Sequence, residues 1–283
     1  MRLGGLLRQV QTPDPERWVN ALQEHGFGAA FRPPIKADAD ESEIRAWGEA
    51  AQAADIVIAE WICWKNPLDA DPEERTKNRQ TLKSALHCAD ILGANCVVAP
   101  AGYPGPDWDA PHESALTEET FDAVVETARA IIDEVQPTRT FYTVEPMPWG
   151  LPDSADNYVR LLKAVDRDRF AAHVDVVNWL TSPQAYFNHT AVIAETFEKL
   201  GPYIKSCHVK DTLIQNSLTV RVDEVRPWLG TLDHGAYLRA IEALGPDTPA
   251  MIEHLQTRDE VEQAAAHLRS VAEREGIVLV GPR

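Results

Sequence analysis

Short apolar runs alternate with longer amphipathic segments along the whole chain of 283 residues. Runs rich in β-branched residues that are separated by helical patterns favour a parallel sheet whose strands are joined by helices. Eight such strand-helix units fit a closed (β/α)8 barrel better than an open sheet, and one such domain typically has about 250 residues. The sequence therefore predicts an α/β fold, with a single (β/α)8 TIM barrel domain over residues 1–283. The expected strands are residues 2–8, 27–32, 55–61, 95–101, 141–145, 171–176, 204–210 and 250–255.

Two helices have clear boundaries in the sequence. One is predicted over residues 72–93, with Pro72 in its first turn and Gly93 at its end. The other is predicted over residues 117–135, with Thr117 as its N-cap and glutamates in its first turn. Later helices are expected to start near Ser154, Pro183, Asp233 and Arg258.

Two connections are longer than a strand-helix turn requires, residues 101–116 and residues 211–230. They follow the fourth and seventh predicted strands, so they belong at the face of a barrel where active sites lie. We expect both segments to cover a substrate.

Composition excludes several classes of function. The 44 Asp and Glu residues against 27 Lys and Arg give a formal charge of −17, which disfavours nucleic acid as a partner. The first apolar stretch is too short for a signal peptide or a membrane span, so we expect a cytoplasmic protein with no membrane contact. The cysteines have no CxxC spacing and are expected to be reduced core residues: Cys63, Cys88, Cys96 and Cys207.

Four residues with ligand-type side chains stand at or just beyond the ends of four of the predicted strands. They are Glu145, Asp175, His208 and Glu253, separated by 30, 33 and 45 residues. A ligand at the same point of successive strand-helix units is what the mouth of a barrel requires. Three carboxylates with one imidazole favour a hard divalent cation: we expect one metal ion, manganese first, with magnesium, cobalt, iron or zinc as alternatives.

The second half of the chain resembles a known family. The segments VEPMP, HVDVVNW, CHVKD, LGTLDHGAYLRAI and MIEH are similar to those of the xylose isomerase-like TIM barrels, which include sugar phosphate isomerases and epimerases. The resemblance covers residues 140–275, while the first half shares only the strand-helix rhythm. It implies that Glu145, Asp175, His208 and Glu253 bind one divalent metal, and that Glu145 and Glu253 are also the catalytic residues that transfer protons.

The resemblance and the chemistry of the ligands together suggest a reaction. A metal that chelates a carbonyl and a neighbouring hydroxyl of a sugar stabilises the enediolate formed when the adjacent proton leaves. Glu145 and Glu253 are expected on opposite faces of the substrate, one removing a proton and the other returning it. Return to the same carbon gives an epimerase, and return to the neighbouring carbon gives an isomerase.

Elimination is the competing reaction, because an enediolate can also expel a group from the next carbon. Relatives of this kind resemble dehydratases of inososes or dehydroshikimate, or subunits that cleave oxidised C-glycosides. Lys210 or His173 would then be the acid. No GxGxxG or GxxxxGK loop for phosphate is present, so an unphosphorylated keto-sugar or polyol is the preferred substrate.

Five further residues are expected to bind substrate: Lys210, Asn178, His173, Trp108 and Trp149. Lys210 shares a strand face with His208 and can polarise an oxygen, and Asp211 is expected to orient one of the two. Asn178 replaces a histidine of many related epimerases, and it can bind a hydroxyl but cannot carry a proton. His173 is more often a core residue, and Trp108 and Trp149 lie in loops where they can stack on a sugar.

Two other residues receive structural interpretations. Glu60 follows the third apolar run and is expected to be a surface carboxylate, although it can also line the pocket. His254 alternates outward from Glu253 and is expected to be structural. A related barrel endonuclease is disfavoured by the negative charge, and a homo-oligomer or a partner subunit that completes the pocket is compatible with the sequence.

Overall fold

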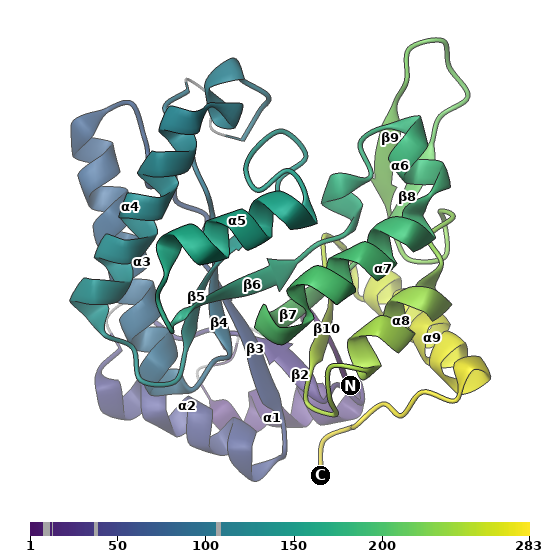
Figure 1. Ribbon diagram of the computed structural model, residues 1–283. Helices are drawn as coiled ribbons and strands as arrows, with labels where there is room; N and C mark the ends of the chain where they lie inside the picture. Colours follow the sequence, from purple (N-terminus) through teal and green to yellow (C-terminus); the bar gives the residue numbers. More distant parts are fainter. Residues whose placement is uncertain (8–11, 13, 37–38, 106–108) are drawn as a thin grey trace.

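The computed structural model describes residues 1–7, 12, 14–36, 39–105 and 109–283. Its main sheet is a closed barrel of parallel strands in the order β1-β10-β7-β6-β5-β4-β3-β2 (Figure 1). The barrel predicted from the sequence is therefore confirmed. Its strands are β1 (Arg2–Gly5), β2 (Ala29–Phe31), β3 (Val57–Ile62), β4 (Cys96–Pro100), β5 (Phe141–Glu145), β6 (Phe170–Val174), β7 (Ile204–Val209) and β10 (Pro249–Ile252).

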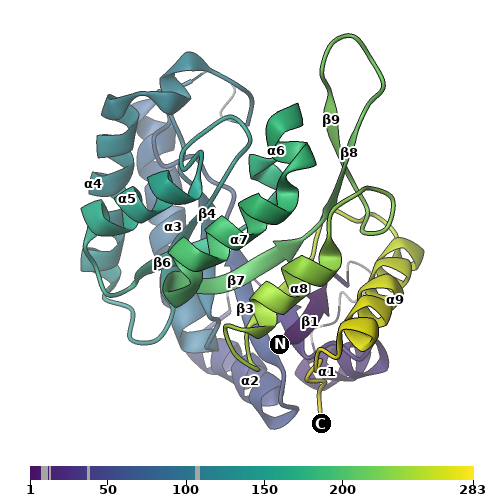
Figure 2. The same cartoon turned by 45° about the vertical axis from the view of Figure 1, so that its right-hand side comes forward.

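The helices surround the barrel, as Figures 1 and 2 show from two directions. Most of them follow a barrel strand, and their apolar sides pack against the barrel and against neighbouring helices. The helices are α1 (Pro15–Glu24), α2 (Glu41–Ala53), α3 (Pro72–Leu92), α4 (Glu118–Val135), α5 (Ala155–Val165), α6 (Pro183–Phe187), α7 (His189–Leu200), α8 (His234–Glu242) and α9 (Arg258–Glu275). Short 3-10 turns lie at Glu113–Leu116, Val177–Trp179 and Gly201–Tyr203.

Local sequence signals explain where these helices begin and end. The carboxylate of Asp71 caps α3, which ends at Gly93 in the left-handed conformation with φ of 85°. Thr117 caps α4 through the amide of Thr120, as expected. Helices also begin at the other predicted positions, but the segment after Pro183 is divided at Asn188 into α6 and α7, which the sequence did not indicate.

The strand ends decide where the polar residues lie. Strand β5 has the predicted limits and ends on Glu145, whereas β6 ends at Val174 and β10 at Ile252. Asp175 and Glu253 therefore stand one residue beyond their strands. Because neighbouring parallel strands carry their carboxyl ends at the same rim, these residues are brought to one side of the barrel.

The long segment after β7 contains a feature that the sequence did not predict. It forms an antiparallel hairpin of β8 (Asp211–Ile214) and β9 (Val222–Val225), paired from Asp211 opposite Val225 to Ile214 opposite Val222. Figures 1 and 2 both show this hairpin extending away from the barrel. Residues 211–230 therefore contain an ordered hairpin, and their role as a substrate cover stays a prediction.

The core confirms the reading of the cysteines as free thiols. Cys63, Cys96 and Cys207 are buried and Cys88 is half-buried, and none of these four forms a disulfide. Burial raises the pKa of Cys63 to about 11. Within the described ranges, no helix is long and apolar enough to cross a membrane.

Candidate metal centre

Four side chains that are far apart in the sequence meet at the rim of the barrel. Each of Glu145, Asp175, His208 and Glu253 offers one ligand atom, and these four atoms lie within 4.8 Å of one another. All four residues are buried, and the most exposed, Glu253, is only 7% exposed. The set is the one that the sequence suggested as metal ligands.

The two ring nitrogens of His208 face different carboxylates. Its Nδ1 lies 3.2 Å from Glu145 Oε1 and 3.1 Å from Glu253 Oε2, so this nitrogen faces the rim carboxylates. Its Nε2 lies 3.0 Å from Glu60 Oε2, on the barrel interior side. If Nε2 carries the proton and donates it to Glu60, Nδ1 is left with a free lone pair toward the carboxylates, as a metal ligand requires.

Glu60 is therefore not a surface residue, and that expectation was wrong. It lies within β3, is fully buried, and accepts a hydrogen bond from the hydroxyl of Ser206 on β7. Burial opposes ionisation of Glu60, but the charge of His208 and the hydrogen bonds from His208 and Ser206 outweigh it and lower the pKa of this carboxyl. A carboxylate on the far side of a ligand histidine is a common second partner in metal sites.

His173 also lies inside the barrel and close to this group. Its ring centroid is 4.2 Å from that of His208, and its Nδ1 is 3.6 Å from Glu60 Oε1. Neither ring nitrogen has a hydrogen-bond partner among the described residues. Burial lowers the pKa of His173 to about 4, so this ring is neutral at neutral pH.

Lys210 extends from the end of β7 into the carboxylates. Its Nζ lies 2.6 Å from Asp175 Oδ2 and 2.8 Å from Glu253 Oε2. These distances are short, yet none of its contacts within the described chain has the direction of a hydrogen bond. Glu224 from β9 is 3.3 Å away, so the hairpin also contributes a carboxylate to this site.

Asn178 and Asp211 form hydrogen bonds that fix the positions of two candidate ligands and of a neighbouring loop. The amide of Asn178 donates to Asp175 Oδ2 at 3.1 Å and to Glu145 Oε1 at 3.3 Å, and thus links two of the candidate ligands. Asp211 accepts from backbone amides, not from His208 or Lys210 as expected, and so fixes the segment that follows β9. These amides belong to Thr212, Trp228, Gly230 and Leu232.

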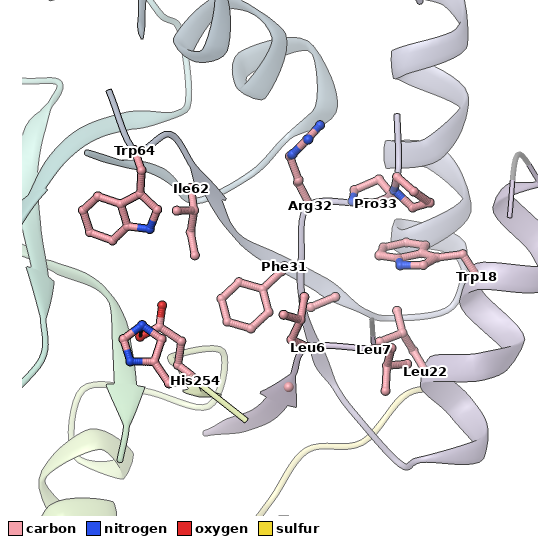
Figure 3. Close-up of a pocket in the computed structure, with 14 residues that line it drawn as sticks. Leu6, Leu7, Trp18, Leu22, Phe31, Arg32, Pro33, Ile62, Trp64 and His254 are labelled. Atoms are coloured by element: carbon pink, nitrogen blue, oxygen red, sulfur yellow. Dashed lines mark ion pairs between the residues drawn. The ribbon is translucent and has the colours of Figure 1, made fainter. Parts of the chain in front are cut away.

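Of the two tryptophans that were expected to bind substrate, the structure describes only Trp149. Trp108 lies outside the described residues. Trp149 borders a small hollow of about 10 Å³ beside Tyr103 and Met147, and its role in substrate binding stays a prediction. His254 is half exposed, and its Nδ1 lies 2.8 Å from Glu224 of the hairpin. Its Nε2 lies 3.4 Å from Glu253 Oε2, so His254 borders the site (Figure 3) and does not point outward from Glu253 as expected.

The charges of the site fit a divalent cation. Burial raises the pKa of Glu145 to about 7. Burial opposes ionisation of Asp175 and Glu253 too, but Lys210 and His208 outweigh it and lower the pKa of both carboxyls. Oε2 of Glu145 and Oε2 of Glu253 are buried without a hydrogen-bond partner in the described chain, and Oε2 of Glu253 is held by the charges of Lys210 and His208. Buried carboxylate oxygens of this kind are donors that a hard metal ion takes.

Comparison with known families agrees with this fold. A family model described as the xylose isomerase-like TIM barrel matches residues 19–271. The chain belongs to the xylose isomerase-like TIM barrel family. The resemblance inferred from the second half of the sequence is thereby confirmed, and the first half is included. No functionally curated protein matches the sequence.

Solved structures of this fold are similar over almost the whole chain. D-psicose 3-epimerase with D-tagatose from Clostridium cellulolyticum H10 is 12% identical with a TM-score of 0.69, over 98% of this chain and 100% of that one. The 3-keto-D-glucoside 4-epimerase of E. coli is 14% identical with a TM-score of 0.68, over 96% of this chain and 99% of that one. The IolI protein with a bound zinc atom is 16% identical with a TM-score of 0.69, over 97% of this chain and 98% of that one. At these identities the likeness shows the fold.

Proposed function

We propose that this chain is a divalent-metal-dependent isomerase or epimerase of an unphosphorylated keto-sugar or polyol. The observation that carries the proposal is the convergence of three carboxylates and one imidazole at the rim of the barrel. Epimerases among the structural neighbours support the sugar as substrate. We further propose one barrel domain over residues 1–283, a cytoplasmic location, and manganese as the native ion.

Glu145, Asp175, His208 and Glu253 would hold the cation. A divalent cation bound there would supply Lewis-acid stabilisation of the negative charge that develops on a carbonyl oxygen. Asn178 keeps Glu145 and Asp175 together through its two hydrogen bonds. Glu60 supports the ring of His208 from the interior.

Glu145 and Glu253 would move the protons. They reach the site from β5 and from the residue after β10, which are separated around the barrel by β6 and β7. This separation lets one carboxylate approach a substrate carbon from one side and the other carboxylate from the opposite side. Both carboxylates are buried, and a buried carboxylate placed against a substrate carbon can act as a general base or, once protonated, as a general acid.

One contact favours a lyase as the second candidate. The ammonium of Lys210, 2.6 Å from Asp175, is a buried acid that can protonate a departing hydroxyl. Elimination would then remove water from the substrate. The two reactions differ in the mass of the product, because isomers keep the mass of the substrate and elimination lowers it.

Elemental analysis and solvent-deuterium exchange test the proposal. The purified protein should contain about one divalent metal per chain and should exchange one carbon-bound proton of a ketose, an inosose or a 3-keto-glycoside. Glu145→Gln and Glu253→Gln should abolish exchange without changing the circular dichroism spectrum, and the surface variant Glu119→Gln should exchange normally. Full exchange in both active-site variants would refute the proton-transfer roles.

A further inference from the structure

Two histidines meet at a second place in the fold, which the proposed reaction does not use. His234 is the first residue of α8 and His267 lies in α9, and Figures 1 and 2 show these two helices side by side. Nδ1 of His234 lies 3.3 Å from Nε2 of His267. His234 is buried and His267 is partly exposed. Two ring nitrogens from different helices therefore face the same point.

The hydrogen bond on the other side of His234 decides which of its nitrogens carries the proton. Nε2 of His234 lies 3.1 Å from the backbone carbonyl oxygen of Lys210. A carbonyl oxygen only accepts, so Nε2 donates and Nδ1 keeps a lone pair that is directed at His267. A histidine that binds a metal usually donates its other ring N–H to a carbonyl or a carboxylate in this way.

Both rings are neutral at neutral pH. Burial lowers the pKa of His234 and of His267 below the ordinary value of an imidazole. Neutral imidazole is the form that coordinates a metal, because the ligand nitrogen must supply a lone pair. His267 can carry its proton on Nδ1 instead of Nε2, and the two facing nitrogens then both present lone pairs.

The separation of these nitrogens fits one bound cation. Zinc binds imidazole nitrogen at about 2.0 to 2.1 Å, so two such nitrogens at a tetrahedral angle lie about 3.3 Å apart. The observed 3.3 Å has this value, and it is longer than most hydrogen bonds. The two rings stand at 75° to one another, and Trp228 stacks on the ring of His267. Packing thus holds the second imidazole in place.

A hollow of about 270 Å³ borders the pair and leaves room for further ligands of the cation. Its charged side chains in the described chain are three carboxylates, of Asp211, Asp233 and Glu275, and one guanidinium, of Arg274. Asp211 and Glu275 already accept hydrogen bonds, so they supply negative charge and not ligand atoms. Water molecules can complete a four-coordinate shell in a hollow of this size.

We propose that His234 and His267 bind a second divalent cation, of the zinc type. Imidazole nitrogen suits Zn²⁺, Ni²⁺ or Cu²⁺, whereas the three carboxylates at the barrel rim favour a harder ion. A cation here would join α8 to α9 and, through His234, to the backbone of Lys210 at the end of β7. Because such an ion binds the folded chain, it would stabilise this part of the barrel.

A count of bound zinc tests this site. Equilibrium dialysis against Zn²⁺ followed by elemental analysis should find one ion fewer per chain in His267→Gln than in the wild-type protein. His87→Gln is the matched control, because His87 is an exposed histidine of α3, and it should keep the wild-type number. Equal zinc content in His267→Gln and in the wild-type protein would overturn the proposal.

A second measurement uses the wild-type protein alone. Diethyl pyrocarbonate acylates neutral imidazole at a free lone pair, and a cation between the two rings leaves none on His267. Zn²⁺ should therefore protect His267 but not His87 from modification, as located by mass spectrometry of peptides. Equal modification of His267 with and without Zn²⁺ would refute the site.

These results are independent of the proposed reaction. If the rim also binds zinc, the count should fall from two ions per chain to one in His267→Gln. If the rim binds no zinc, the count should fall from one ion to none. The loss of one ion supports the histidine site in both cases, and the proton-transfer roles of Glu145 and Glu253 are tested separately by deuterium exchange.

Discussion

The carboxylate of Glu60 and the Nε2 of His208 lie 3.0 Å apart, on the side of the ring that faces away from the other carboxylates. This contact selects which ring nitrogen is free for a metal. Loss of it should weaken the site even though Glu60 is not among the four candidate ligands that surround His208 Nδ1.

We therefore expect Glu60→Met to lower the affinity for Mn²⁺ by about 10- to 100-fold, which is the usual effect of removing such a partner. Glu60→Gln keeps an acceptor oxygen for Nε2–H and should lose less. Competition with a fluorescent chelator measures the affinity. Glu119→Met is the matched control, because Glu119 is an exposed carboxylate of α4 and has no contact with the site. Wild-type affinity in Glu60→Met would show that this contact does not orient the ligand.

Lys210 shares Asp175 and Glu253 with any cation that binds there. Removal of its ammonium should relieve this competition. We therefore expect Lys210→Met to bind Mn²⁺ about tenfold more tightly in calorimetry, because the gain in binding free energy should be on the order of the energy of one ion pair. Without added metal the same variant should unfold at a lower temperature, because the buried carboxylates then repel one another without a compensating charge.

Lys205→Met provides the control for Lys210. Lys205 lies near the start of β7, the strand that Lys210 follows, but its ammonium lies 4.3 Å over the ring of Phe141, away from the carboxylates. Its replacement should leave metal affinity unchanged. Weaker metal binding in Lys210→Met would mean that Lys210 organises the carboxylates and does not compete for them.

Asp90 in α3 should make stability depend on pH. Its carboxylate accepts from the backbone amides of Thr138, Arg139 and Thr140 at 2.8 to 2.9 Å, and thereby holds the start of β5. Burial opposes ionisation, but these hydrogen bonds lower the pKa of Asp90 below its ordinary value. We expect Asp90→Asn to lower the free energy of unfolding at pH 7 by about 1 to 2 kcal/mol.

The sign of the pH effect follows from the lowered pKa. The stabilisation by Asp90 is complete above the pKa of the unfolded chain, near 4, and it is lost as the pH falls through the lower pKa of the folded state. Urea unfolding of both proteins at pH 7, 5 and 3.5 should therefore show a difference that narrows in acid. A constant difference across this range would indicate that the charge of Asp90 is unimportant.

The sequence predicted the barrel and the four rim residues because both follow from local patterns. Glu145 closes an apolar run, and Asp175 and Glu253 follow such runs by one residue, so their position at the rim depends only on strand direction. An error of a few residues in the predicted strand limits does not change which residues lie at the rim. The observed strands are shorter than predicted, and the four candidate ligands still lie where the sequence predicted them.

Glu60 could not be recognised in the same way. Its partners Ser206 and His208 lie 146 and 148 residues away and reach it across the interior of the barrel. Glu60 closes an apolar run as Glu145 does, but the sequence does not show that its side chain meets Ser206 and His208 inside the barrel. The hairpin was missed for a related reason, since β8 and β9 are only four residues each and lie in a polar segment.

Strand β10 pairs with β1 on one side and with β7 on the other, and it thereby closes the ring. Glu253 follows this strand directly, so the fourth candidate ligand joins the other three only when residues near both ends of the chain have come together. Long-range pairing of this kind is slow to form. Capture of a cation by all four side chains would therefore report that the entire cylinder has been assembled.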